Sequence, residues 1–551
     1  MKKSGRPVFL RSLTWAVVIF PAVFLEAALL YSQKVPLIWF FSSYENFFMA
    51  GLLQGLIIFA CVKLVDISQV VSFLVFLLLA SFSTLSIVHC LVFNSVVSLG
   101  AIASFLESNL QEGSEFLLIV PSWIYVVAAC YFVLCLILFM ITKPASGRRL
   151  VGFCFHATVF LVCVVLLFYT SLGFKSKALN QGFIWKALNI SFNASPHLRP
   201  VSGYKFYREE KQKIAGYKST IGDTPFLIAS VNDLPATVVL VVGESMRRDR
   251  LGIYDYPLDT TPFLSSIRDE LLIFKNAISP APLTYYSVPR FLTTQSVQKG
   301  DSFEQSPSVV HLAKQAGYKT FWISNQAVIG GPEGPAAAIA SIADNHAFTN
   351  TDGNSSSLDG RVVEHVNVAI DDPSKKKFIV IHLIGSHPAF HRRYPTSFEY
   401  FTADMYSNKQ MDEQSKSVNA HYDNSILYTD SLLKEIITSL DEKAPNYASL
   451  IFLADHGMIL PQSSNDFYGH GNSDDMHDVP FFIWMKGREV DISDRQKNAN
   501  YLTENLIHSL SNILNVRYKR YDQSLDILHE GYQQPSLKIL DNNKKTRVYA
   551  R

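Results

Sequence analysis

Hydrophobic and polar positions alternate in two different ways along the chain. Up to about residue 174, long apolar runs follow one another, and five of them are long enough to cross the ~30 Å hydrocarbon core of a bilayer. They lie at Leu13–Tyr31, Phe47–Val62, Val70–Phe93, Leu117–Ile141 and Val151–Leu172. We therefore expect residues 1–174 to form an α-helical transmembrane domain with five spans.

After residue 236 the pattern changes to short β-branched runs separated by amphipathic stretches. Buried strands are predicted at Thr237–Val242, Lys319–Ile323, Phe378–Ile384, Ser449–Ala454 and Pro480–Met485. Helices are predicted at Val309–Ala316, Arg361–Ile370, Val418–Leu440 and Tyr501–Leu514. This alternation is typical of an α/β domain whose largely parallel central sheet has helices on both faces. We assign it to residues 236–551.

Residues 175–235 form a polar connector between the two parts. Its amphipathic stretch Phe183–Ile190 is expected to lie on the membrane surface. Basic residues gather before the first span and between the fourth and fifth, whereas Asn94–Phe116 has none. By the positive-inside rule the chain starts in the cytoplasm, so five spans place everything after Phe174 on the opposite side.

The distribution of charge excludes a wholly soluble and a wholly membranous protein. The chain has 49 Lys/Arg and 47 Asp/Glu, and only 15 of these 96 residues precede residue 174. A net charge of +2 gives no reason to expect a nucleic acid partner. All cysteines lie in or beside the apolar runs, so the exported part must fold without disulfides. They are Cys61, Cys90, Cys130, Cys135, Cys154 and Cys163.

Candidate metal ligands follow three of the predicted strands. Glu244 comes after the first strand, His387 after the third, and Asp455 with His456 after the fourth. In α/β folds, ligands bind beyond the carboxyl ends of the strands. Carboxylate and imidazole together suit zinc or manganese. His470 and His477 follow a little further on.

Three residues are candidates for a hydroxyl nucleophile near that site. Thr284 and Ser287 lie where a loop leads into a predicted helix, and Ser245 directly follows Glu244. A helix N-terminus and a nearby metal would both stabilise an alkoxide. Spacing along the chain does not choose among the three hydroxyls, which are also common as helix caps.

The segment Ser104–Glu115 breaks the apolar pattern on the outer side of the membrane. It mixes carboxylates and amides, including Ser108, Asn109 and Glu112. By itself it is best explained as an ordinary solvated loop.

These residues together resemble the membrane-bound phosphoethanolamine transferases of Gram-negative bacteria, within the alkaline phosphatase/sulfatase superfamily. The resemblance covers nearly the whole chain, including the five apolar runs. Its motifs are Glu107–Phe116, Gly243–Ser245, Asp259–Pro262, Thr284 with Ser287–Pro289, His382–His387, Arg393–Pro395, Tyr422–Asn424, Tyr428–Asp430 and Asp455–Gly457.

The resemblance implies a role for each candidate. Thr284 matches the nucleophile and a ligand of one Zn²⁺, with Glu244, Asp455 and His456 as the other ligands. His387 and His470 match residues that bind the phosphoryl group, and Ser108, Asn109 and Glu112 match the lipid-donor site. One departure is that Pro280 and Arg290 stand where the lipid A enzymes have cysteines flanking the nucleophile.

The activity implied is transfer of phosphoethanolamine from phosphatidylethanolamine, through a covalent threonine intermediate, to a cell-envelope acceptor. Lipopolysaccharide (at lipid A, Kdo or heptose) is the expected acceptor, and a periplasmic glucan is the alternative. The enzyme would be a multi-pass protein of the bacterial inner membrane with a periplasmic catalytic domain and no obligate protein partner. Alternatives are a phosphoglycerol transferase, a sulfatase and a catalytically silent receptor. Against the sulfatase, Arg290 directly follows Pro289, one residue too early for the Ser/Cys-x-Pro-x-Arg signature.

Overall fold

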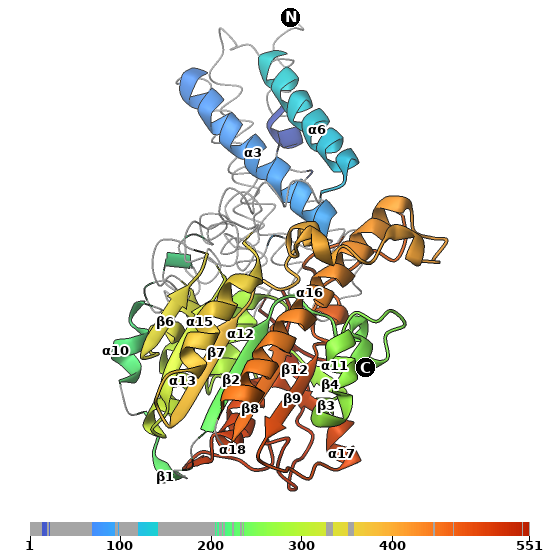
Figure 1. Cartoon of the computed structure of the whole chain (residues 1–551). Helices are drawn as coiled ribbons and strands as arrows, with labels where there is room; N and C mark the ends of the chain where they lie inside the picture. Colours follow the sequence, from blue (N-terminus) through green and yellow to red (C-terminus); the bar gives the residue numbers. More distant parts are fainter. Residues whose placement is uncertain are drawn as a thin grey trace, which may run out of the picture. The chain divides into compact units, whose positions relative to one another are not determined.

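The computed structural model describes part of the first 235 residues and nearly all of the rest (Figure 1). The described residues are 14–18, 21, 69–93, 97, 120–141, 204, 207–208, 212, 215–222, 225–231, 234, 236–326, 334–350, 357–444, 447–464, 466, 468–542 and 544–549. The expected spans Phe47–Val62 and Val151–Leu172, most of Leu13–Tyr31, the stretch Phe183–Ile190 and the polar segment Ser104–Glu115 lie outside them. The chain divides into two compact units, and residues 208–551 belong to the second.

Two long apolar helices are described in the first unit, α3 (Gln69–Phe93) and α6 (Ser122–Ile141). They coincide with the third and fourth predicted spans, and Phe73–Val92 and Ser122–Met140 are long and apolar enough to cross a membrane. They pack through the stacked rings of Phe76 and Phe139, whose centroids are 4.4 Å apart.

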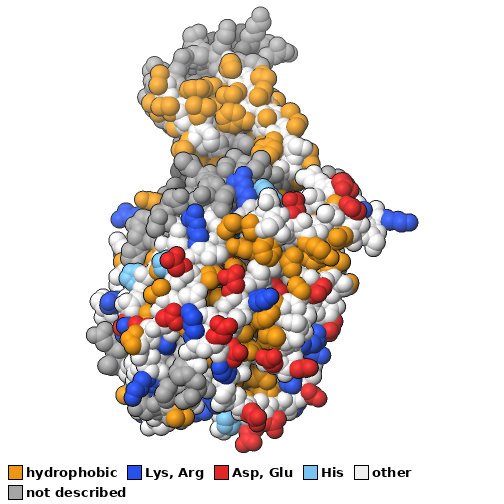
Figure 2. All heavy atoms as spheres, viewed as in Figure 1, with side chains coloured by type: hydrophobic (Ala, Val, Ile, Leu, Met, Phe, Trp, Pro, Cys, Tyr) orange, Lys and Arg blue, Asp and Glu red, His pale blue; other side chains and the backbone are white. Residues whose placement is uncertain are grey.

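The remaining faces of these two helices stay apolar. Val126 and Met140 of α6 are 61% and 70% exposed, and Figure 2 shows hydrophobic side chains covering the visible face of both helices. A helix that is apolar all round and still exposed requires lipid or protein around it rather than water. Of the five predicted spans, the described residues thus contain two.

The second unit is built on a seven-stranded sheet with the order β3-β9-β8-β2-β7-β5-β6. Its strands are β2 (Ala236–Gly243), β3 (Leu271–Phe274), β5 (Lys319–Ser324), β6 (Asn345–Phe348), β7 (Lys376–His382), β8 (Ala448–Ala454) and β9 (Phe481–Lys486). All five strands predicted from the pattern are present. Strands β8, β2, β7, β5 and β6 are parallel, so the sheet is largely parallel as expected.

Strand β9 is the exception, because it runs antiparallel to both of its neighbours, β8 and β3, so β3 again runs in the direction of the parallel strands. A parallel pair needs a long crossover connection, usually a helix on one face of the sheet. Between β8 and β9 the described residues contain only the short 3₁₀ turn Asp474–Met476, so the chain returns antiparallel.

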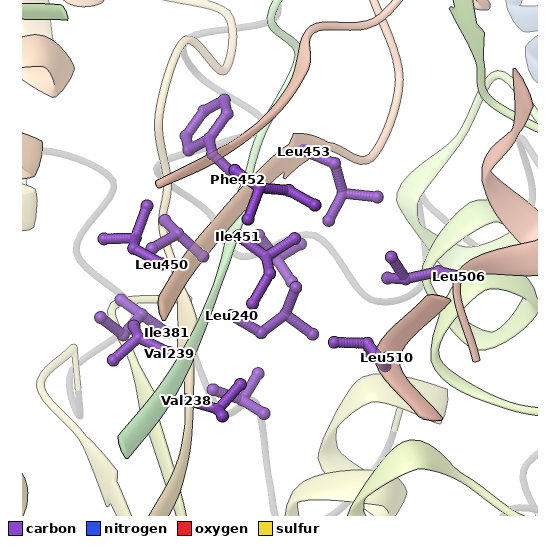
Figure 3. Packing of buried hydrophobic residues seen from close by; sticks show 14 of the residues in the cluster. Val238, Val239, Leu240, Ile381, Leu450, Ile451, Phe452, Leu453, Leu506 and Leu510 are labelled. Carbon is purple, nitrogen blue, oxygen red and sulfur yellow. The ribbon is translucent and has the colours of Figure 1, made fainter. Parts of the chain in front are cut away.

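Helices cover both faces of this sheet (Figure 1). α15 (Val362–Ile370) and α16 (Glu413–Lys443) pack together on one face, and α13 (Val309–Gln315) and α18 (Leu506–Ile513) pack together on the other. Figure 3 shows Leu506 and Leu510 of α18 beside the buried side chains of β2 and β8. Every residue of β2, β7 and β8 is buried, which explains why these strands appear in the sequence as continuous apolar runs.

Smaller elements complete the unit. They are α10 (Tyr217–Ile221), α11 (Pro262–Ser266), α12 (Thr284–Leu292), α14 (Pro335–Ala340), α17 (Asp494–Lys497), β1 (Ile228–Val231), β4 (Asn276–Ile278), β10 (Asn500–Leu502), β11 (Val516–Tyr518), β12 (Lys538–Leu540) and β13 (Thr546–Val548).

The predicted helix Tyr501–Leu514 is wrong at its start. Residues 500–502 form β10, which pairs in parallel with β4, and the helix begins only at Leu506. The Tyr501 side chain is buried and stacks on Phe481 at 5.1 Å between ring centroids. A short apolar run does not distinguish strand from helix by its pattern, and here pairing with a distant strand decides it.

Candidate metal centre and nucleophile

The candidate ligands come together at the carboxyl end of the parallel sheet. Glu244 follows β2, the Leu383–His387 turn follows β7, and Asp455 and His456 follow β8. Strands β7 and β8 are the two neighbours of β2, so three strand ends meet at one place. This is the arrangement that the sequence predicted.

Thr284 lies against two of these ligands. Its hydroxyl donates to Glu244 Oε2 at 3.1 Å and lies 3.2 Å from His456 Nε2. His456 Nε2 is also 3.5 Å from Glu244 Oε1. Glu244 and His456 are buried, whereas Thr284 is half-buried and therefore reachable. A reactive hydroxyl thus adjoins a carboxylate and an imidazole.

Asp455 completes the cluster with one oxygen held and the other available. Its Oδ1 accepts the backbone N–H groups of Ser245 (3.0 Å) and His456 (2.7 Å). Its Oδ2 lies 3.3 Å from His456 Nε2 and accepts no hydrogen bond from the residues that the structure describes, although it is fully buried. A buried carboxylate oxygen without a donor is costly unless a cation compensates it.

The electrostatics of the site also favour a cation. Burial, and then the neighbouring charge of Asp455, raise the pKa of Glu244 well above its ordinary value. Two carboxylates so close resist being ionised together until a positive ion joins them. Two carboxylates, an imidazole and a hydroxyl are a ligand set that suits zinc, so the residues present fit this metal.

The geometry distinguishes the three candidate nucleophiles. Thr284 is the first residue of α12, the helix that begins after the turn of Pro280 and Pro282. Ser287, one turn further on, is 0% exposed, and its hydroxyl contacts none of the candidate ligands as a hydrogen-bond partner among the described residues. The Ser245 hydroxyl donates to Glu244 Oε1 at 2.6 Å and is buried. Only Thr284 is both beside the ligands and accessible.

His387 and His470 lie beside the cluster as a pair. Their ring centroids are 6.0 Å apart, and that of His470 is 5.0 Å from His456. Burial, and then the proximity of His456, lower the pKa of His470 to about 3, so its ring is neutral near pH 7. The ligand atoms offered by Glu244, His456 and His470 lie within 4.8 Å of one another, which makes His470 a further possible ligand.

His477, noted in the sequence only for its proximity, has a different role. It is buried, and its Nδ1 lies 2.9 Å from the carbonyl of Ser279 in the loop that leads to Thr284. Ser108, Asn109 and Glu112 lie outside the described residues, so their placement stays a prediction from the sequence.

Two residues that the sequence analysis did not single out approach the cluster from β5. Gln326 donates to Glu244 Oε2 at 3.4 Å, and Asn325 donates to the buried Asp359 at 3.0 Å. The sequence could have indicated both residues. They follow the predicted strand Lys319–Ile323 in the same way that the candidate ligands follow the other predicted strands.

The part of the chain that carries the candidate site is similar in sequence to known proteins. Residues 236–516, just over half of the chain, match the family model described as Sulfatase. The putative transferase YhbX of Escherichia coli O157:H7 is 32% identical over 61% of this chain, and the phosphoethanolamine transferase EptC of Escherichia coli K12 is 28% identical over 63%. The alignments span 59% and 63% of those two proteins, so this chain matches about three fifths of their length.

Solved structures show the same fold. The C-terminal periplasmic domain of Escherichia coli EptC, in complex with Zn, superposes with a TM-score of 0.54 and 25% identity over 59% of this chain and 95% of that one. The integral membrane lipooligosaccharide phosphoethanolamine transferase A of Neisseria meningitidis gives a TM-score of 0.68 and 18% identity over 97% and 99% of the two chains. At that identity, the second likeness concerns the fold alone.

Proposed function

The chain belongs to the sulfatase family, and from this premise we propose that it is a zinc-dependent phosphoethanolamine transferase of the bacterial inner membrane. Its donor would be phosphatidylethanolamine, and its acceptor a cell-envelope glycolipid such as lipopolysaccharide, at lipid A, Kdo or heptose. The observation that carries the proposal is the Thr284 hydroxyl, at a helix N-terminus and within 3.2 Å of both Glu244 and His456.

In the first half of the reaction, Thr284 attacks the phosphorus of the donor as an alkoxide. A bond forms between Thr284 Oγ1 and phosphorus, the bond from phosphorus to the diacylglycerol oxygen breaks, and that oxygen takes up a proton. The N-terminal turn of α12 favours negative charge on Thr284. Zn²⁺ held by Glu244, Asp455, His456 and Thr284 would act as a Lewis acid that stabilises the alkoxide.

In the second half, an acceptor oxygen attacks the same phosphorus and the bond to Thr284 breaks. The phosphoryl oxygens carry negative charge throughout, and His387 and His470 adjoin the cluster on one side. These two histidines would donate hydrogen bonds to the phosphoryl oxygens or carry protons to and from them. Ser108, Asn109 and Glu112 are proposed to bind the headgroup of the donor.

The membrane part of the proposal rests on the apolar runs of the sequence. Five spans starting in the cytoplasm would place the catalytic domain in the periplasm, where donor and lipid-linked acceptor diffuse in the same leaflet. The apolar helices α3 and α6 support two of these spans, and the fold likeness to an integral membrane transferase extends over 97% of the chain.

The sulfatase chemistry of other family members fits this site less well. A sulfatase would need its reactive residue at Ser287, the serine of the Ser-x-Pro sequence. The Ser287 side chain is 0% exposed within α12, whereas Thr284 adjoins the candidate ligands. We therefore favour threonine-based phosphoryl transfer.

The test is mass spectrometry of lipopolysaccharide and periplasmic glucans from cells with the gene, without it, and with a Thr284→Ala copy. We expect phosphoethanolamine on lipopolysaccharide only with the intact gene. Phosphoethanolamine on the glucans alone would change the acceptor. Envelope components that are identical in all three strains would refute the transferase proposal.

A further inference from the structure

The backbone around Glu244 is fixed by the ends of the two neighbouring strands. On the β8 side, the N–H of Asp455 donates to the carbonyl of Gly243 at 3.0 Å. On the β7 side, the N–H groups of Leu383 and Ser386 donate to the carbonyls of Val242 and Glu244, both at 3.0 Å. The position of this candidate ligand therefore depends on the turn that follows β7.

That turn, residues 383–386, touches Glu244 directly. Gly385 has a φ of +53°, in the left-handed region that favours glycine. A Cβ at this position would lie 2.9 Å from both the backbone nitrogen and the backbone oxygen of Glu244. The close approach means that a displaced turn would displace Glu244 as well.

The carboxylate of Asp359 holds this turn by hydrogen bonds to its backbone. Its Oδ1 accepts the N–H of Ile384 at 2.9 Å, and its Oδ2 accepts the N–H of Gly385 at 2.7 Å. The side chain amide of Asn325 donates to Oδ1 at 3.0 Å. Asp359 is only 3% exposed, and burying a carboxylate is costly unless such donors compensate it.

Asn325 is itself held in the orientation that serves Asp359. Its side-chain oxygen accepts hydrogen bonds from the hydroxyls of Thr349 and Ser357, both at 2.8 Å. Because that oxygen is occupied, the amide nitrogen is the end that faces Asp359. The support of the turn thus extends to the end of β5.

Gln326 makes a second link from the same strand end. Its amide nitrogen donates to the carbonyl of Leu383 at 2.8 Å and to Glu244 Oε2 at 3.4 Å. The same Oε2 atom of Glu244 also accepts the hydrogen bond from the hydroxyl of Thr284. One side chain therefore connects the turn to the carboxylate of the candidate ligand.

We propose that Asp359 and Gln326 are positioning residues of the metal centre. Asp359 fixes the backbone of Glu244 through the turn 383–386, and Gln326 orients the Glu244 carboxylate toward Thr284. The inference rests on the proposed function for the reaction, whereas the affinity for Zn²⁺ is a property of the site itself. Groups that orient the ligands of a metal typically affect its affinity about 10- to 100-fold.

The experiment measures Zn²⁺ affinity of the full chain in detergent by competition with a chelator. Asp359→Asn keeps the size of the side chain but replaces one acceptor oxygen by a donor. Asp430→Asn is the matched control, because Asp430 is also buried and also accepts two successive backbone N–H groups, those of Phe263 (2.8 Å) and Leu264 (3.0 Å). Both variants should melt at lower temperature, but only Asp359→Asn should bind Zn²⁺ about tenfold or more weakly.

Gln326→Leu is the second variant, and it tests the link from Gln326 to Glu244 whether or not Asp359→Asn folds. It should weaken Zn²⁺ binding, and it should lower kcat for a soluble phosphodiester while leaving KM unchanged. Wild-type Zn²⁺ affinity in Gln326→Leu, or in folded Asp359→Asn, would overturn the proposal for that residue. Weakened Zn²⁺ binding in both, with no phosphoethanolamine transfer by the wild type, would refute the proposed function but not the positioning roles.

Discussion

Ser245 is a residue whose strained backbone connects the two carboxylates of the site. Its φ is +58°, a left-handed conformation that costs a non-glycine residue about 1 kcal/mol or more. Its N–H bonds to Asp455 Oδ1 and its hydroxyl to Glu244 Oε1, while Tyr422 donates to its carbonyl at 2.8 Å. These three contacts keep the strained conformation, and through it they fix the separation of Glu244 from Asp455.

The first prediction separates the two hydroxyls of α12. Thr284→Ala should reduce transfer by at least about 1,000-fold, because covalent catalysis loses its nucleophile. Ser287→Ala should retain activity and stability close to wild type, since the Ser287 hydroxyl is buried without a hydrogen-bond partner among the described residues. Both are checked by transfer assays and melting curves on the same preparations. Transfer that survives in Thr284→Ala and vanishes in Ser287→Ala would reverse the assignment.

The second prediction concerns acid stability and His508. Asp522 donates its N–H to Nδ1 of this buried ring at 3.1 Å, and burial lowers the pKa of His508 to about 4. The unfolded chain, with a histidine pKa of about 6.5, takes up the proton first. The contribution of this group to the free energy of unfolding is therefore complete above pH 6.5 and is lost as the pH falls toward 4.

At pH 4 the free energy of unfolding is lower by roughly 3 kcal/mol because of His508 alone. A residue that does not titrate in this range would cause no such loss. We expect His508→Gln to have a shallower fall in melting temperature than wild type between pH 7 and pH 4.5. Melting curves of the two proteins across that range check this. Parallel curves would mean that His508 does not titrate with the lowered pKa.

At the scale of elements, the site is made by loops that follow three adjacent strands and by the start of one helix. The loop after β8 is additionally packed against the segment 470–478, which carries His470. The N–H of Gly457 donates to Met476 at 2.9 Å, and a Cβ on Gly457 would lie 1.9 Å from the backbone oxygen of Asp475. Because Gly457 has no side chain, the loop after β8 can lie directly against the segment 470–478.

The third prediction follows from that contact. Gly457→Ala must push the backbone of one loop away from the other, so it should destabilise the protein by about 2 kcal/mol or more. It should also weaken Zn²⁺ binding, because His456 is the preceding residue. Thermal melting and zinc competition check both effects. Gly531→Ala is a control, since its Cβ would meet side chains and no backbone, the nearest atom being in the ring of His529 at 3.1 Å. Normal zinc affinity in Gly457→Ala would show that the two loops adjust independently.

At the scale of the whole molecule, the chain joins a strongly apolar part to a domain with mixed charges. In the second unit, Lys/Arg and Asp/Glu are interspersed on the face seen in Figure 2. An anchor for such a domain needs only one span, whereas the sequence contains five apolar runs and the polar segment Ser104–Glu115. If the chain is the proposed transferase, we expect its membrane part to bind the lipid donor as well as to anchor the second unit.

The fourth prediction tests this expectation through Glu112, which we expect to pair with the ammonium group of phosphatidylethanolamine. Glu112→Ala should lower transfer from membrane phosphatidylethanolamine at least about tenfold, because a charge-assisted contact at the interface is lost. Zinc content and hydrolysis of a soluble phosphodiester should be unchanged. Normal transfer by Glu112→Ala would make the segment an ordinary loop.

The sequence by itself determined the main division of the chain and the location of the chemistry. Long apolar runs predict spans, and short β-branched apolar runs predict buried strands, because the hydrophobicity of a segment is local in the sequence. Glu244, Asp455 and His456 could be found from the same pattern, since polar residues directly after such strands gather at one edge of a parallel sheet. The order of the strands was not needed for that inference.

Only the tertiary structure decided which of these residues meet and what supports them. The choice of Thr284 over Ser287, the antiparallel direction of β9, the strand at Tyr501 and the link from Asp359 to Glu244 each depend on contacts between segments far apart in the chain. Asp359 and Gly385, for example, are 26 residues apart. Such contacts are set by how the strands pair and the helices pack, and the local pattern of hydrophobic and polar positions does not encode that pairing.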